Sequence, residues 1–240
     1  MKKKLISLLL SLCMVMSLAS VPALAAEGDE PEPNTEDTSA TISVRSQDDL
    51  VNAFKTIGES DDTDEWTISL TGDITLAGNS QTELQVGAGK TVTLLGNSHT
   101  ITYNSDTNSA SSSLTLCANG GTLNLGASDG SDTLTITANN TLDHADPLIK
   151  VLGGGIVNMY KGVTLTGNTC TSSNAGGVDI QAGTFNMYGG TISHCESLFG
   201  YGGAVWVNGQ LSNVSSAFNM YDGTITENKV TGSYNKNKRY

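Results

Sequence analysis

Carboxylates are the side chains of this sequence best suited to chemistry, because they act as general acids, as bases or as ligands of hard cations. Hydrolysis of a glycosidic bond needs two of them on either side of the bond, and a lyase needs several gathered around calcium together with a basic residue. The β-rich part of the chain has eleven scattered acids, most of them at turns: Asp73, Glu83, Asp106, Asp129, Asp132, Asp143, Asp146, Asp179, Glu196, Asp222 and Glu227. Arg239 is the only arginine after Arg45. We therefore expect no catalytic residues.

Metal and thiol chemistry have equally little support in the sequence. His99, His144 and His194 are scattered and form no ligand-spaced pair, so we expect neither a metal site nor a cofactor. Beyond the N-terminal leader the cysteines are Cys117, Cys170 and Cys195, an odd number that favours small apolar core fillers over a disulfide framework. A Cys170–Cys195 disulfide remains an alternative, although the repeats described next place the two residues out of register.

A short phrase recurs three times near the C-terminus, at residues 157–162, 185–190 and 218–223. Its copies read Val-Asn-Met-Tyr-Lys-Gly, Phe-Asn-Met-Tyr-Gly-Gly and Phe-Asn-Met-Tyr-Asp-Gly, and they are 28 and then 33 residues apart. Repetition at this period is typical of a solenoid, in which each unit buries its apolar face against its neighbours.

Alternation along the repeated strand divides its residues between two faces. Val or Phe and Met are expected inside, and the outward residues should form ladders along the axis: Asn158, Asn186 and Asn219, then Tyr160, Tyr188 and Tyr221. Trp206 faces outward on a neighbouring strand. Such ladders either stabilise stacked strands without contacting a ligand, or form an aromatic and amide strip that stacks on sugar rings. These seven residues are our candidate ligand-binding site.

The remaining strands support an all-β chain in which a parallel β-helix occupies residues 66–230. Like residues repeat on the strands before and after the phrase, as in Val178 with Val205 and in Ile192 with Ile225. A sandwich would not repeat its core residue by residue. At about 25 residues per unit this range gives six or seven coils.

Residues 41–65 are expected to form a short strand and an amphipathic helix that caps the β-helix. Ser46 is a suitable N-cap. The apolar stripe that should face the core consists of Leu50, Ala53, Phe54 and Ile57.

The two ends of the chain have compositions of their own. Residues 1–25 resemble a secretory signal, with a basic start, an apolar stretch and a small-x-small site that predicts cleavage after Ala25. Residues 26–40 predict a disordered acidic linker, and residues 231–240 a poorly ordered tail. Cleavage would leave 9 basic against 24 acidic residues, which excludes nucleic acid as a partner. We expect a secreted or cell-surface protein with no membrane span once the signal is removed.

The segments at 183–187, 190–193 and 202–207 resemble the degenerate repeats of right-handed parallel β-helix proteins. The likeness is greatest to adhesin-like exported surface proteins of gut bacteria with the pectate-lyase-like fold. It implies a right-handed solenoid and a surface module that binds a glycan or a host or cell-surface polymer. A divergent polysaccharide lyase or hydrolase and the N-terminal piece of a longer structural surface protein remain alternatives.

Overall fold

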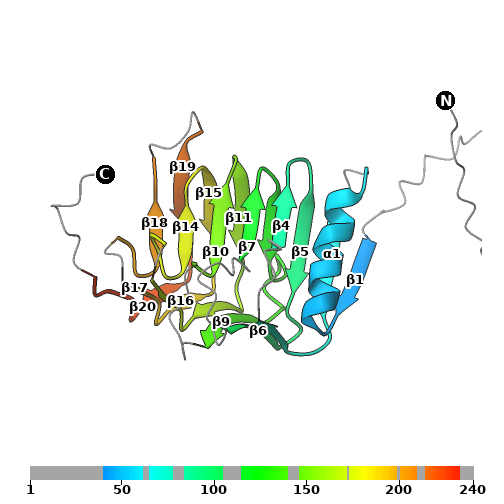
Figure 1. Ribbon diagram of the computed structural model, residues 1–240, viewed down its shortest axis with the longest axis horizontal. Coiled ribbons are helices and arrows are strands. Elements are labelled where there is room, and N and C mark those ends of the chain that lie inside the picture. The colour runs from blue at the N-terminus through cyan, green and yellow to red at the C-terminus, as the bar shows by residue number, and fades with distance from the viewer. Residues whose placement is uncertain are drawn as a thin grey trace, which may run out of the picture. The chain divides into compact units, whose positions relative to one another are not determined.

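A computed structural model describes residues 40–61, 65–77, 84–104, 115–139, 146–171, 173–198, 201–209 and 214–232. The predicted signal segment, the acidic linker apart from Ala40 and the tail beyond Gly232 lie outside these residues. All pairings between named strands are parallel, and successive strands of the chain belong to different sheets (Figure 1). The described chain is therefore the parallel β-solenoid expected from the repeats.

Four sheets run along the solenoid, and we name them A to D. Sheet A contains β1 (Ala40–Val44), β2 (Glu65–Leu70), β5 (Thr91–Leu95), β8 (Thr122–Leu125), β11 (Gly155–Met159), β15 (Gly183–Met187) and β19 (Ser216–Met220). Sheet B contains β3 (Ile74–Ala77), β6 (His99–Asn104), β9 (Leu134–Asn139), β12 (Val163–Thr166), β16 (Thr191–Ser193) and β20 (Thr224–Thr226).

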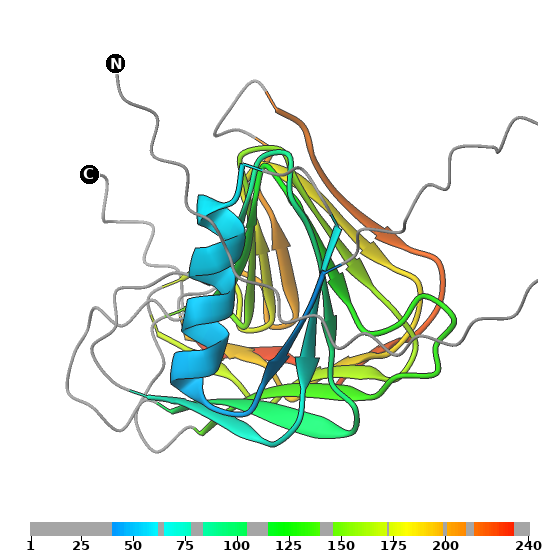
Figure 2. The ribbon, with the colours of Figure 1, turned by 90° about the vertical axis from the view of Figure 1, so that its right-hand side faces the viewer.

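Sheets C and D complete each coil. Sheet C contains β4 (Leu84–Gly87), β7 (Leu116–Asn119), β10 (Ile149–Leu152), β14 (Val178–Ile180) and β18 (Val205–Val207). Sheet D lies between sheets B and C along the chain and contains β13 (Thr169–Cys170), β17 (Glu196–Ser197) and β21 (Lys229–Val230). A coil therefore runs from C through A and B to D, and sheets A, B and C form three sides around the core when viewed along the axis (Figure 2).

The solenoid has about five turns, so the estimate of six or seven coils was too high. Equivalent core positions in sheet A are Trp66, Val92, Leu123, Val157, Phe185 and Phe218, which gives spacings of 26, 31, 34, 28 and 33 residues. The assumed 25 residues per coil was too short because long connections join sheet B to sheet C in the earlier coils, where β6 ends at Asn104 and β7 begins at Leu116.

The core is a stack of aliphatic side chains that repeat from coil to coil. In sheet A, Val157 and Met159 lie beside Phe185 and Met187, and all four are fully buried. Phe185 also stacks on Phe218, with ring centroids 5.7 Å apart. The Val or Phe and the Met of the repeated phrase therefore face inward, as the alternation predicted.

One helix, α1 (Gln47–Glu59), lies between β1 and β2 along the chain and against β4 (Figures 1 and 2). The apolar stripe Leu50, Ala53, Phe54 and Ile57 is buried in the core, as predicted. Ser46 is its N-cap, and the Ser46 hydroxyl accepts a hydrogen bond from the Asp49 amide at 3.2 Å. Within the described residues, no helix is both long and apolar enough to cross a membrane.

Candidate functional site

A continuous ladder of asparagine amides runs along the outer face of sheet A. Asn219 donates through Nδ2 to Oδ1 of Asn186 at 3.0 Å, Asn186 donates to Asn158 at 2.9 Å, and Asn158 donates to Asn124 at 2.8 Å. The ladder ends where Asn124 donates to the Thr93 hydroxyl at 3.2 Å. All the amides point the same way, so the ladder has a polarity: every bond runs from a later coil to an earlier one.

Asn124 is a member of this ladder that the sequence argument missed. Its strand has the same alternation as the later copies, with Thr122 and Asn124 outward and Leu123 and Leu125 buried. The signal was therefore present as an apolar-Asn-apolar pattern, but the tyrosine and the methionine that marked the other copies are absent here.

The tyrosines form a stack at the corner that follows sheet A. The rings of Tyr160 and Tyr188 have centroids 5.5 Å apart and planes 13° apart, and those of Tyr188 and Tyr221 are 4.9 Å and 7° apart. The stack begins at Tyr160, because Gly126 occupies the equivalent place one coil earlier, with φ +78 and Val163 too close to admit a side chain. Burial and then the neighbouring Tyr188 raise the pKa of Tyr160 above its ordinary value.

Stacking decides which part of each tyrosine a ligand can reach. Since the rings face one another, the accessible parts are their outward edges and hydroxyls, together with the outer face of Tyr221 in the last coil. Exposure follows this order: Tyr160 is half-buried, Tyr188 is 42% exposed and Tyr221 is 64% exposed. A sugar that stacks on a ring face would therefore contact Tyr221 first, and the rest of the site would offer edges and polar groups.

Trp206 does not join this surface. It lies on β18 in sheet C, beside Asp179 of β14, and its ring is 5.8 Å from that of Tyr201 between centroids. The structure thus brings the six asparagines and tyrosines together on and beside sheet A, and places Trp206 on another side of the solenoid.

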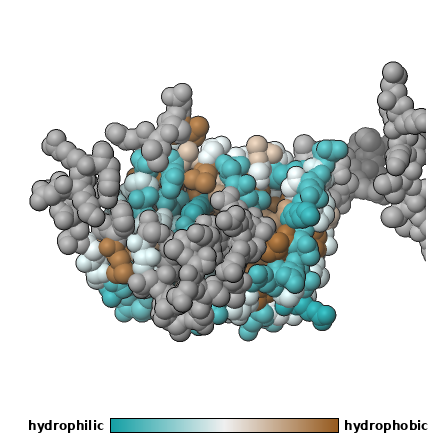
Figure 3. Space-filling view, in the orientation of Figure 1, coloured by the Kyte–Doolittle hydropathy of each residue, from teal (hydrophilic) through white to brown (hydrophobic). Residues whose placement is uncertain are grey.

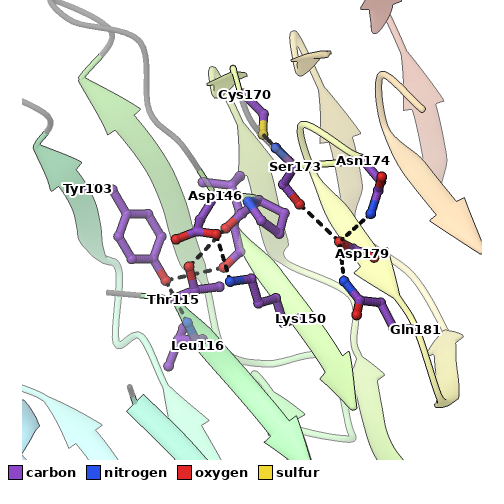
Figure 4. Close-up of polar contacts among 12 residues, drawn as sticks. Tyr103, Thr115, Leu116, Asp146, Lys150, Cys170, Ser173, Asn174, Asp179 and Gln181 are labelled. Carbon is purple, nitrogen blue, oxygen red and sulfur yellow. Dashed lines mark hydrogen bonds and ion pairs between the residues drawn. The ribbon is translucent and has the colours of Figure 1, made fainter. Parts of the chain in front are cut away.

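Two charged side chains of sheet C are largely covered. Asp179 is fully buried and the Lys150 side chain is 17% exposed. They do face away from the core, yet side chains of the connecting segment cover them: Ser173 and Asn174, with Gln181, donate to Oδ2 of Asp179 (Figure 4). Lys150 forms an ion pair with Asp146 at 2.7 Å.

A second set of buried polar side chains forms hydrogen bonds to the backbone where the chain turns from one sheet to the next (Figure 4). The buried Tyr103 hydroxyl donates to the carbonyl of Leu148 and accepts from the amide of Leu116, and burial raises the pKa of Tyr103. Further along, Asn168 donates to the carbonyls of Asp146 and Gly176. These groups satisfy backbone atoms where the chain turns, which is a structural role.

Cys195 occupies the corner position of Asn168 and Asn228 in the intervening coil. Its amide donates to Asn228 Oδ1 at 2.9 Å, and burial raises the pKa of its thiol to about 11. The register pairs Cys170 with Ser197, so Cys170 and Cys195 are offset. Cys117, Cys170 and Cys195 are all buried thiols.

Several of the described carboxylates accept hydrogen bonds from backbone amides at turns. Asp132 accepts from the amides of Gly96 and Asn97 at 2.8 and 2.7 Å, and Asp222 accepts from the Gly223 amide at 2.7 Å. In the part of the chain that the structure describes, no three His, Cys, Asp or Glu side chains are grouped so as to hold a metal ion. Glu83, Asp106, Asp143 and His144 lie outside that part.

On the face shown in Figure 3, hydrophilic residues are interspersed with smaller areas of hydrophobic residues. Comparisons of the chain with family models, with curated proteins and with solved structures gave no significant match. The asparagine ladder and the tyrosine stack are therefore the features from which a function has to be argued.

Proposed function

We propose that this protein is an exported, non-catalytic β-solenoid module that binds a glycan or a similar surface polymer along sheet A. The observation that carries the proposal is the tyrosine stack Tyr160–Tyr188–Tyr221 beside the asparagine ladder. The adhesin-like and pectate-lyase-like likeness of the repeats supports the same class of function.

The spacing of the surface favours a polymer with a regular repeat. Neighbouring strands of a sheet lie about 4.8 Å apart, so the three coils that contain β11, β15 and β19 each present one amide and one phenol hydroxyl at that interval along the axis. Each asparagine Nδ2 has one hydrogen in the ladder and a second one for a ligand, and the phenol groups both donate and accept. An extended glycan lying along the axis would find the same pair of groups at each of these three coils.

Export is supported by the sequence alone. The basic and apolar leader ending in Ala23-Leu24-Ala25 has the pattern of a secretory signal. The acidic composition, with a formal net charge of −12 for the whole chain, suits neutral or basic polymers better than anionic ones.

A glycan array with the purified protein and a Tyr160→Ala, Tyr188→Ala, Tyr221→Ala variant tests the proposal. We expect the wild type to bind at least one glycan class and the variant to lose at least ten-fold in affinity for it. The matched control replaces Thr164, Thr191 and Thr224, which form an equivalent three-coil row on sheet B, with Ala. Equal binding by the wild type and the tyrosine variant would reject sheet A as the binding surface.

A Tyr188→Phe variant separates the two ways in which the tyrosines can act. Phenylalanine keeps the ring stack and removes one hydroxyl, so unchanged affinity would assign binding to the rings and reduced affinity to the hydroxyl edge.

A further inference from the structure

The asparagine ladder of sheet A uses only part of the hydrogen-bonding capacity of each amide. Asn158, Asn186 and Asn219 each donate one hydrogen bond from Nδ2 to the preceding coil, at 2.8, 2.9 and 3.0 Å. Among the described residues, these three side chains form no hydrogen bond outside the ladder. Because a primary amide has two N–H hydrogens and two lone pairs on its oxygen, each asparagine keeps one donor and one acceptor.

The geometry of the ladder determines where these unused groups point. The register places the three asparagines at equivalent positions of β11, β15 and β19, and the bonds have nearly equal lengths, as in a row of parallel amides. In such a row, only the N–H that points opposite to the C=O bond can reach the next oxygen. The other N–H and the other lone pair therefore lie side by side in the amide plane and point along the side chain, away from sheet A.

Each asparagine thus offers a ligand an adjacent donor and acceptor, which few groups of surface polymers can use together. A carboxylate has acceptors only, and the formal net charge of −12 opposes an acidic sugar as well. A trans secondary amide, such as an N-acetyl group, directs its N–H and its C=O to opposite sides. Two hydroxyls on neighbouring ring carbons can use both groups, since one donates to Oδ1 while the other accepts from Nδ2.

The tyrosine stack adds a second row of groups suited to hydroxyls. Tyr160, Tyr188 and Tyr221 each follow an asparagine of the ladder by two residues, so they lie on the same side of the chain as the amides. Their ring centroids are 5.5 and 4.9 Å apart, close to the spacing of about 4.8 Å between strands. A phenol hydroxyl both donates and accepts, so this row can bind a further hydroxyl of the same sugar.

We propose that the polymer bound along sheet A carries free vicinal hydroxyl pairs, each held by one asparagine of the ladder. The inference rests on the function proposed above and narrows the ligand to a neutral glycan with unsubstituted hydroxyls on adjacent carbons. The linkage of a hexose chain decides whether it has them. A 1,4-linked chain keeps the hydroxyls at C2 and C3, whereas a 1,3-linked chain has no adjacent pair within the chain.

Affinity electrophoresis of the wild type in gels that contain one neutral polymer tests this inference without any variant. The probes are an α-1,4-linked glucan, a β-1,4-linked galactomannan and a β-1,3-linked glucan. We expect at least one 1,4-linked polymer to retard the protein, with an affinity about ten-fold or more above that for the 1,3-linked glucan. Periodate cleaves the carbon–carbon bond of a vicinal diol, so oxidation of the bound polymer should abolish the retardation.

An Asn186→Thr variant provides a second measurement. Threonine suits a strand but has one hydroxyl in place of the adjacent donor and acceptor of the amide. The matched control, Asn139→Thr, changes an exposed asparagine of β9 in sheet B. We expect Asn186→Thr to weaken binding of the 1,4-linked polymer by about five-fold or more and Asn139→Thr to change it by less than about two-fold.

The outcomes separate this inference from the proposed function. Equal retardation by 1,3-linked and 1,4-linked polymers, binding that survives periodate, or equal effects of the two threonine variants would overturn the role of vicinal hydroxyls and leave sheet A as a glycan-binding surface. Retardation by neither 1,4-linked polymer would overturn it as well. Binding to no glycan on the array would reject the proposed function itself.

Discussion

Asn186 shows how one residue type takes its role from the face on which it lies. Its amide donates to Asn158 and accepts from Asn219, so it joins three coils through side-chain atoms alone. A buried asparagine at a corner, such as Asn168, uses the same groups to satisfy backbone carbonyls instead. Asparagine therefore bonds to other side chains on the outer face of sheet A and to backbone carbonyls at a corner. The groups that its neighbours present determine which partners it has.

Replacing Asn186 with Ala should lower the free energy of unfolding by about 1–2 kcal/mol, because two hydrogen bonds are lost and two partners are left unmatched. Asn219→Ala removes one such bond at the end of the ladder and should cost roughly half as much. Urea unfolding at pH 7 measures both. Equal costs would contradict a ladder that is continuous through Asn186.

Cys195 gives a dependence on pH whose sign follows from burial. Burial raises the pKa of the thiol from 9.0 to about 11, so the thiol is neutral in both folded and unfolded chains below pH 9. As the pH rises from 9 through 11, unfolded chains lose the proton first, and the contribution of the buried thiol to stability is lost, by up to about 2–3 kcal/mol.

We expect Cys195→Ala to be less stable than the wild type at pH 8 and to lose less stability between pH 8 and 11. Urea unfolding with a reductant present at each pH measures how the free energy of unfolding changes with pH in the two proteins. Other groups that titrate at alkaline pH, such as Tyr103, contribute equally to both and cancel in the difference. Parallel curves for the two proteins would contradict a raised pKa at Cys195.

At the scale of elements, the sequence pattern predicted the strands and the helix, whose apolar residues recur at regular spacing. It did not predict the connections between them, which have no repeated pattern. The stripe of α1 and the inward residues of β11, β15 and β19 were correct because large apolar residues recur at fixed places. The number of coils was wrong because the connections from sheet B to sheet C vary in length. The burial of Asp179 has no local signal in the sequence, because Ser173 and Asn174, which donate hydrogen bonds to it, belong to such a connection.

The N-cap of α1 provides a test at this scale. Ser46 accepts from the Asp49 amide, and Asp49 in turn accepts from the Arg45 amide, both at 3.2 Å. Ser46→Ala should lower the free energy of unfolding by about 1 kcal/mol, and Ser46→Asp should preserve it. Ser43→Ala, on the exposed side of β1, serves as the control with an expected change of less than about 0.5 kcal/mol. A Ser46→Ala variant as stable as this control would show that the cap does not hold the helix.

At the scale of the whole molecule, one repeated phrase supplies both core residues and the outward ladders of sheet A. Sequence alone grouped the asparagines and tyrosines correctly, since they share a strand and its corner. It also grouped Trp206 with them, because the residues were chosen for facing outward and not for belonging to the same sheet. The stacked rings leave their edges, and not their faces, accessible to a ligand. This stacking follows from the spacing of the coils and could be recognised only once the register of the strands was known.

The central claim is that the solenoid binds a glycan without cleaving it. The most direct measurement is incubation of the purified protein with a panel of polysaccharides, scoring retention of the protein on each polymer and release of soluble oligosaccharides from it. We predict retention on at least one polymer with no release above a protein-free control. Oligosaccharides released in proportion to the amount of protein, or no retention on any polymer, would contradict the account.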